Sequence, residues 1–165
     1  MRLRVFVLSM FLIAAPGVRA EQDQALKQLV ARAESARIEE QPGLYTEAAR
    51  LELKAADRLY TAGNADDARA AVRDLVTYSD KAHDASTRSG KKLKDTEIAM
   101  RKMAEKLRDI KRAVNFEEQA PLQVAADHLE GLRTDLLSHM FSKGDRKSTR
   151  LNSSHTVLSR MPSSA

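Results

Sequence analysis

The 165-residue chain contains no cysteine and no tryptophan, and it has only 4 prolines and 6 glycines. The absence of cysteine excludes disulfide bonds, thiolate metal sites, thiol catalysis and lipid attachment through a thiol. The sequence also lacks a glycine-rich phosphate loop, a nucleophile elbow, a His-Glu-x-x-His motif and the Glu-x-x-His pairs of diiron bundles. We therefore expect a protein that is not an enzyme and that has no cofactor, metal or catalytic residues.

Long apolar runs are also missing, except over residues 5–15. This run is about half of the roughly 20 residues that a membrane-spanning helix needs. It follows the basic leader Met1 to Arg4 and precedes Pro16 to Ala20, so residues 1–20 are predicted to be a secretory signal peptide. We expect export to the periplasm or exterior of a bacterial cell, with no transmembrane segment after signal cleavage.

The end of the sequence resembles a short-read sequencing adapter translated in one frame. Asp145 to His155 match one block of the adapter, and Ser159 to Ala165 match the next stretch of the same oligonucleotide. The resemblance implies that residues 145–165 are a non-native, disordered tail. Residues 21–144 then form the mature helical domain.

The formal net charge of +5 belongs to the ends of the chain. Residues 1–20 contribute 3 net positive charges and residues 145–165 contribute another 3, which leaves −1 over residues 21–144. A balanced domain gives no electrostatic reason to bind polyanions. We expect no nucleic-acid partner.

The remaining chain is rich in good helix formers, and its apolar residues recur every three or four positions. This spacing predicts helices over residues 22–40, 44–62 and 121–141, with Gly63 ending the second and Asn64 able to cap the next. An uninterrupted heptad series predicts one long helix over residues 65–114, with a kink or turn near residues 89–90 as the alternative. The predicted fold is all-α, an antiparallel, coiled-coil-like bundle of about four helices.

The second half of the long helix has a stripe of large apolar residues, which we call the seam. Pairing with the last helix alone would leave part of this stripe exposed, so we expect self-association or a partner protein to complete it. The seam consists of Leu93, Met100, Met103, Leu107, Ile110 and Val114.

Nine basic residues surround the seam against four acidic ones. They form either a solvated face with ion pairs such as Glu97–Arg101 and Asp109–Arg112, or a docking surface. The docking surface would bind acidic proteins, anionic lipids or polysaccharide. Because the stripe is narrow and lacks Trp and Phe, protein contact is favoured over peripheral membrane contact. The candidate docking charges are Lys91, Lys92, Lys94, Arg101, Lys102, Lys106, Arg108, Lys111 and Arg112.

Two groups of acidic and histidine residues have helical spacing. Asp80, His83 and Asp84 share one helix face, and Asp135 and His139 form an i,i+4 pair. Such groups can contribute to a divalent metal site, but helix surfaces often present them as solvated pairs. The second interpretation is favoured at both places.

The region from Ala70 to His83 resembles the last hairpin of exported, soluble b-type cytochromes. The resemblance implies haem ligated by His83. Those bundles also need a methionine on the first helix as the second axial ligand, and no methionine lies between Met10 and Met100. We therefore expect His83 to be a surface histidine.

The stretch from residue 55 to residue 75 resembles the helix-turn-helix of a tetratricopeptide repeat. The resemblance covers about one repeat and lacks the usual glycine in the first helix, whereas solenoids need three or more units. A tight two-helix hairpin explains the same residues. The matching positions are Ala56, Leu59, Gly63, Ala68, Val72 and Leu75.

Three further stretches, residues 39–45, 89–94 and 103–111, are similar to a group of exported, all-helical bacterial proteins with no assigned function. We expect a non-enzymatic protein-interaction scaffold or adaptor of the cell envelope. One alternative is a periplasmic holdase, which the chain resembles in export and size but not in net charge. The other is a bundle that binds haem or another small ligand.

Overall fold

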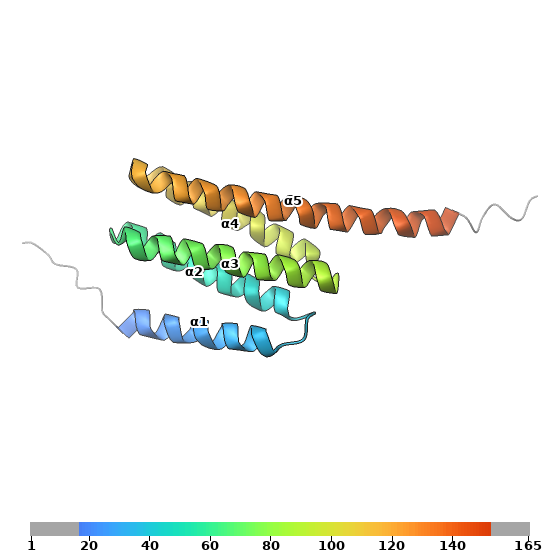
Figure 1. Ribbon diagram of the computed structural model, residues 1–165, viewed down its shortest axis with the longest axis horizontal. Helices are drawn as coiled ribbons and strands as arrows, with labels where there is room; N and C mark the ends of the chain where they lie inside the picture. The colour runs from blue at the N-terminus through green and yellow to red at the C-terminus, as the bar shows by residue number, and fades with distance from the viewer. Residues whose placement is uncertain (1–16, 153–165) are drawn as a thin grey trace, which may run out of the picture.

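The computed structural model describes the backbone of residues 17–152 and the side chains of residues 23–142. The helices run roughly along the long axis of the molecule (Figure 1). The predicted all-α class is confirmed, although the expected count of about four helices is too low. Within the described range there are five helices and no strands: α1 (Gly17–Ser35), α2 (Gln41–Thr61), α3 (Ala65–Ser89), α4 (Leu93–Ala113) and α5 (Phe116–Asn152).

α2 and α3 form a hairpin with a tight turn at Gly63, as predicted. Gly63 has a φ of +80°, a left-handed conformation that glycine adopts without steric cost. The N–H groups of Gly63 and Asn64 donate to the carbonyls of Tyr60 and Leu59 at 3.1 and 2.9 Å, which are the two bonds of a Schellman motif. Asn64 occupies the N-cap position of α3, but its side chain makes no capping hydrogen bond.

The prediction of one continuous helix over residues 65–114 is wrong, because the chain reverses between α3 and α4. Gly90 and Lys92 have φ values of 65° and 55°, and α4 runs back alongside α3 (Figure 1). The turn follows the stretch of small residues at the end of α3, where Ser86 Oγ and Thr96 Oγ1 lie 2.8 Å apart across the reversal. Since both helices present their heptad stripe to one core, the periodicity continues across the turn and cannot reveal it.

The outer helix bounds also differ from the prediction. α1 extends from Gly17 to Ser35, so the predicted cleavage site after Ala20 falls within it, and residues 1–16 lie outside the described residues. α5 begins at Phe116 and includes Pro121. It continues through residues 145–152, which the sequence predicted as disordered, and the rest of the predicted tail, residues 153–165, is outside the described residues.

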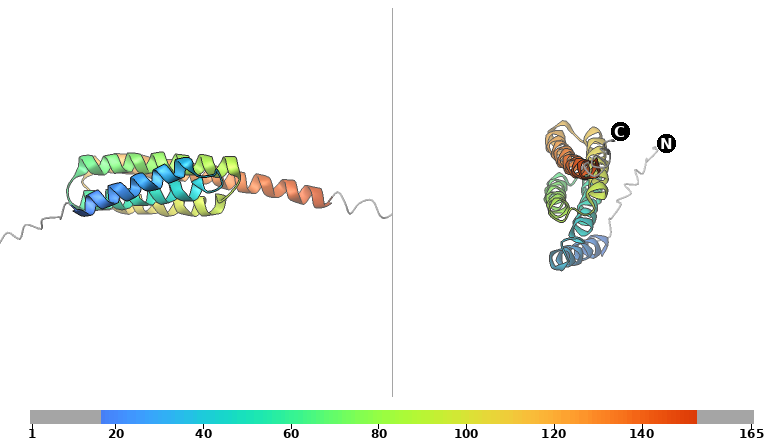
Figure 2. Two further views of the ribbon diagram at one scale, coloured as in Figure 1. Left: turned by 90° about the horizontal axis from the view of Figure 1, so that it is seen from below. Right: turned by 90° about the vertical axis from the view of Figure 1, so that its right-hand side faces the viewer.

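The core lies among α2, α3, α4 and α5, and α1 lies at the edge of the bundle (Figure 2). α1 contributes only Ala33 to the fully buried side chains, and among the described helices it packs against α2 alone. No described helix combines the length and apolar composition needed to cross a bilayer. The largest fully buried apolar side chains are Leu75, Met100, Met103, Leu107, Leu122, Leu129 and Leu136.

Candidate functional site

The predicted seam is part of the intramolecular core. Its first five residues are at most 9 % exposed, and Val114 is half-buried. The seam belongs to one cluster with the buried leucines of α5, and α2 and α3 also pack against α4. The exposed apolar surface of the seam is smaller than predicted, because α2 and α3 cover α4 in addition to the last helix. The reason for expecting a partner at this seam is thereby removed.

The predicted docking charges divide into two groups. Four form contacts within the molecule: Lys106 Nζ with Asp57 at 2.8 Å, Arg108 with Glu130 at 3.1 Å, Lys111 with Gln123 at 2.8 Å, and Arg112 with Asp109. The other five are exposed and form no ion pair among the described residues: Lys91, Lys92, Lys94, Arg101 and Lys102. Seven of these nine residues lie on α4, and Lys91 and Lys92 lie in the turn before it, but the nine do not surround an exposed apolar surface.

Ion pairs close the interface between α4 and α5. Arg133 Nε donates to Glu97 Oε1 at 2.8 Å, and its Nη1 donates to Glu130 Oε2 at 3.2 Å. Burial alone would raise the pKa of Glu130, but the hydrogen bonds from Arg133 and Arg108 outweigh it and lower the pKa. The predicted Glu97–Arg101 pair does not form, because Glu97 is 8 % exposed and turns toward α5.

Two of the three described histidines pair with aspartates between α3 and α5, and the third pairs with an aspartate within α5. His83 Nε2 lies 2.7 Å from Asp135 Oδ2, and His128 Nε2 lies 2.6 Å from Asp80 Oδ1. His139 Nδ1 lies 3.3 Å from Asp135 Oδ2. Among the described residues, no three His, Asp or Glu side chains gather as metal ligands. The spaced acidic and histidine residues of α3 thus serve as contacts to the neighbouring helix.

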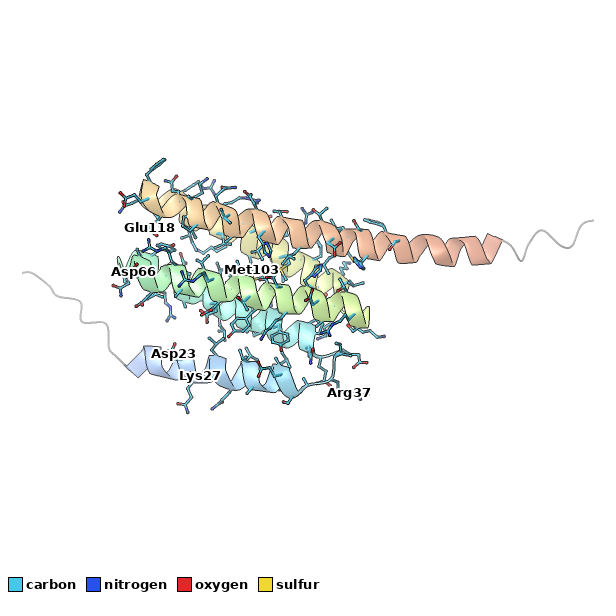
Figure 3. The ribbon with its side chains drawn as sticks, viewed as in Figure 1. Asp23, Lys27, Arg37, Asp66, Met103 and Glu118 are labelled. Carbon is cyan, nitrogen blue, oxygen red and sulfur yellow. The ribbon has the colours of Figure 1, made fainter. Side chains whose placement is uncertain are left out.

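A polar cluster closes one end of the bundle, where Figure 3 labels Asp66 and Glu118. Arg69 Nη1 donates to Glu118 Oε1 at 2.6 Å, and Arg69 also pairs with Asp66. Burial and the nearby carboxylate of Glu118 raise the pKa of Tyr60. This cluster joins the ends of α2, α3 and α5, and Glu118 Oε2 is buried in it without a hydrogen-bond partner among the described residues.

The remaining candidate is a groove of about 950 Å³ between α1 and the α2–α3 hairpin, which we call the α1 groove. Figure 3 labels Asp23 and Lys27, two of the residues that α1 contributes. Its volume is at the upper end of the roughly 300–1,000 Å³ typical of ligand sites. Its lining is mostly apolar. The apolar residues are Leu26, Val30 and Ala31 of α1, Leu51, Ala55 and Leu59 of α2, Ala62 directly after α2, and Ala70, Ala71 and Tyr78 of α3.

The α1 groove exists because α1 has too few neighbours. The apolar spacing of α1 puts Leu26, Leu29 and Val30 on one face, but they remain half-buried because α2 covers only part of that face. On α2, the stripe that includes Leu51 and Leu59 faces the same space and is likewise only partly buried. Two apolar faces therefore border a space that no described helix fills.

Glu52 is a nearly buried carboxyl in the lining of this groove. It lies on α2 between two leucines, is 7 % exposed, and forms no hydrogen bond or ion pair among the described residues. Burial, followed by the negative charges of Asp74 and Asp23, raises the pKa of Glu52 to about 7. Burial, Asp74 and Glu52 also raise the pKa of Tyr78. The groove thus combines apolar walls with excess negative potential around one carboxyl.

The apolar stripes of the first two helices are visible in the sequence, but the groove between them is not. The sign that was available is Glu52, a charged residue flanked by Leu51 and Leu53 within an otherwise apolar and alanine-rich stripe. The arrangement can hold an apolar or amphipathic ligand and can attract a cation at one point. Comparisons of the chain with protein-family models, with curated proteins and with solved structures found no match.

Proposed function

We propose that this protein is a non-enzymatic scaffold or adaptor that binds an amphipathic helix of a partner protein in the α1 groove. The observation that supports this proposal is the mostly apolar groove bounded by three helices. Isolated apolar side chains on a surface are ordinary, but a contiguous apolar groove is typical of interaction sites. Helix-in-groove binding is a common mode of peptide recognition.

The dimensions of the groove favour a helix as the occupant. The α1 residues that line it extend from Asp23 to Glu34. At 1.5 Å per residue this corresponds to about 17 Å, or about three helical turns. α1 packs against α2 but not against α3. A helix placed between α1 and α3 would contact all three lining helices and would bury their half-exposed apolar faces.

The proposed location is the bacterial periplasm or exterior. Residues 1–20 have the basic leader, short apolar run and small-residue end of a secretory signal peptide. The partner would then be another exported or envelope protein. Cleavage after Ala20 would leave every residue that lines the α1 groove on the mature chain.

A groove-filling substitution tests this function. Ala55→Trp places an indole in the groove, whereas Ala120→Trp adds the same side chain at an exposed position of α5. We expect Ala55→Trp to weaken binding of a fluorescent, 14-residue amphipathic helical peptide by at least about tenfold, a loss of about 1.4 kcal/mol. Ala120→Trp should bind like the wild type. If the wild type does not bind the peptide, or if both variants bind equally, the proposal is wrong.

The second candidate is a holdase, because an open apolar groove also suits segments of unfolded proteins. The two functions differ in selectivity. A holdase should suppress aggregation of an unfolded outer-membrane protein, and Ala55→Trp should abolish that suppression. A scaffold should leave aggregation unchanged while it binds the folded helix.

A further inference from the structure

The placement of Glu52 indicates what kind of helix the α1 groove selects. We propose that the bound helix inserts a lysine or arginine from its apolar face into the groove, where the cation pairs with Glu52. This inference rests on the function proposed above and specifies the chemistry of the partner. It assigns Glu52 the role of the specificity-determining residue of the groove.

Glu52 has no cationic partner among the described residues. Lys27, Lys54 and Arg58 also line the groove, but none of them forms an ion pair with Glu52. Arg58 Nε instead donates to the carbonyl of Lys54 at 3.3 Å. Buried carboxylates are usually paired, because an unpaired charge in a dry environment is unfavourable. The missing cation is therefore expected to come from the occupant.

The charge around Glu52 is predominantly negative. Asp23 on α1 and Asp74 on α3 act on Glu52 from the two neighbouring helices, and both add negative potential. Glu34, also in the groove, lies 3.6 Å from Lys81 Nζ and is partly neutralised. A cation is attracted to such a site, whereas an acidic side chain is repelled. The charged and titratable residues that line the groove are Asp23, Lys27, Glu34, Glu52, Lys54, Arg58, Asp67, Asp74 and Tyr78.

The affinity of the groove for a cationic helix should depend on pH. Because the pKa of Glu52 is raised to about 7, this carboxyl is protonated in part of the population at neutral pH. A cationic side chain favours the ionised form, so its binding releases a proton. Affinity for a cationic helix should therefore increase between pH 6 and pH 8. A helix without the cation should show no such increase.

The test uses three synthetic helical peptides that differ only at one central position of the apolar face. The position holds lysine, norleucine or glutamate, and binding to the full chain is measured by fluorescence anisotropy at pH 6 and pH 8. The wild type should prefer lysine to norleucine by about 10- to 100-fold at pH 8, the range expected for a hydrogen bond to a charged group. The glutamate peptide should bind most weakly.

Glu52→Gln should abolish the preference for lysine while it retains binding of the norleucine peptide. Glu105→Gln, at an exposed position of α4, is the matched control and should keep the preference. If the wild type binds the lysine and norleucine peptides equally, or if Glu52→Gln keeps the preference, the role of Glu52 is refuted while the groove remains a binding site. If no peptide binds to the wild type, the proposed function fails as well.

Sedimentation velocity of the protein alone tests the other possible occupant, a second copy of the chain. We expect a monomer, because the proposed occupant is a different protein. A dimer that Ala55→Trp dissociates and Ala120→Trp does not would show that a second copy fills the groove. That result would overturn the assignment to a cationic helix of a partner.

Discussion

The α4–α5 side of the molecule and the α1 edge are built from the same kind of amphipathic helix. Only on the α4–α5 side do neighbouring helices cover the apolar face completely. The apolar stripe of α4 packs against α5, α2 and α3, and its large residues are nearly inaccessible to solvent. The stripe of α1 packs against α2 alone, and Leu26 and Val30 stay half-buried. The number of neighbours, rather than the stripe itself, determines whether an apolar face becomes core or a groove.

The two regions also differ in whether a buried glutamate has an ion-pair partner. Glu97 on α4 and Glu52 on α2 are almost equally inaccessible, at 8 % and 7 % exposed. Arg133 of α5 donates a hydrogen bond to Glu97 at 2.8 Å, whereas no described residue pairs with Glu52. A buried carboxyl that lacks a partner is destabilising, because its charge is left uncompensated.

The largest expected effect comes from truncating a leucine in each region. Leu107→Ala in the closed core should lower the free energy of unfolding by about 3 kcal/mol, because it leaves a cavity among packed side chains. Leu26→Ala in the open groove should cost less than about 1 kcal/mol, because Leu26 is only half-buried. Urea denaturation followed by circular dichroism measures both. Equal losses would mean that the α1 edge is as tightly packed as the core.

The next effect is the pH dependence of stability that Glu52 introduces. Its pKa is about 7 in the folded chain and 4.5 in the absence of the fold. Between these values the folded state binds more protons than the unfolded state, so stability decreases as pH rises from about 4.5 to about 7 and is level above that. The total loss of stability over this pH range is about 2 kcal/mol, because water in the open groove screens part of the effect.

Glu52→Gln should therefore stabilise the protein by about 2 kcal/mol at pH 8 and should have little effect at pH 4. Thermal unfolding of this variant and of Glu105→Gln across that range provides the measurement and its control. A stabilisation that is the same at both pH values would show that Glu52 does not titrate between them. A loss of stability at pH 8 would indicate that Glu52 has a cationic partner in the free protein.

The smallest of the three effects concerns the ion pair that closes α4 against α5. Arg133→Met keeps much of the apolar stem but leaves Glu97 buried without a partner, at an expected cost of about 1 kcal/mol. Arg101→Met, which removes an exposed and unpaired arginine from α4, should change stability by less than about 0.5 kcal/mol. The difference between the melting temperatures of the two variants measures the contribution of the Arg133–Glu97 ion pair. If the two variants melt at the same temperature, Arg133 and Arg101 are equivalent surface residues.

Some elements could be predicted because local chemistry specifies them. Gly63 ends α2 in a left-handed conformation that the glycine itself suggested, and the three-four spacing identified helical stretches that the structure contains. The reversal at Gly90 was expected only as the alternative to a continuous helix, because both sides of the turn contribute to one heptad register. Lys92 adopts a positive φ there, which no propensity of lysine indicates.

The candidate site depends on tertiary arrangement, and this is why the sequence did not reveal it. Periodicity correctly marked the apolar residues of the seam and of α1, but it does not count the helices that will surround each stripe. Met103 and Leu107 were expected to remain partly exposed and are core, whereas Leu26 faces the open groove. The sequence shows Glu52 as a charge within an apolar stripe, but only the fold shows that its side chain is buried without a partner.

We propose that the α1 groove, and not the basic face of α4, binds a partner helix. Hydrogen exchange of the full chain, with and without the saturating lysine peptide, tests it directly. Bound peptide should slow exchange of the amides in residues 23–35 of α1, because a helix packed against α1 and α3 restricts its opening. Exchange in residues 93–113 should stay unchanged. Protection confined to α4, or unaltered exchange in α1 under saturating peptide, would show that the helix does not bind in the α1 groove.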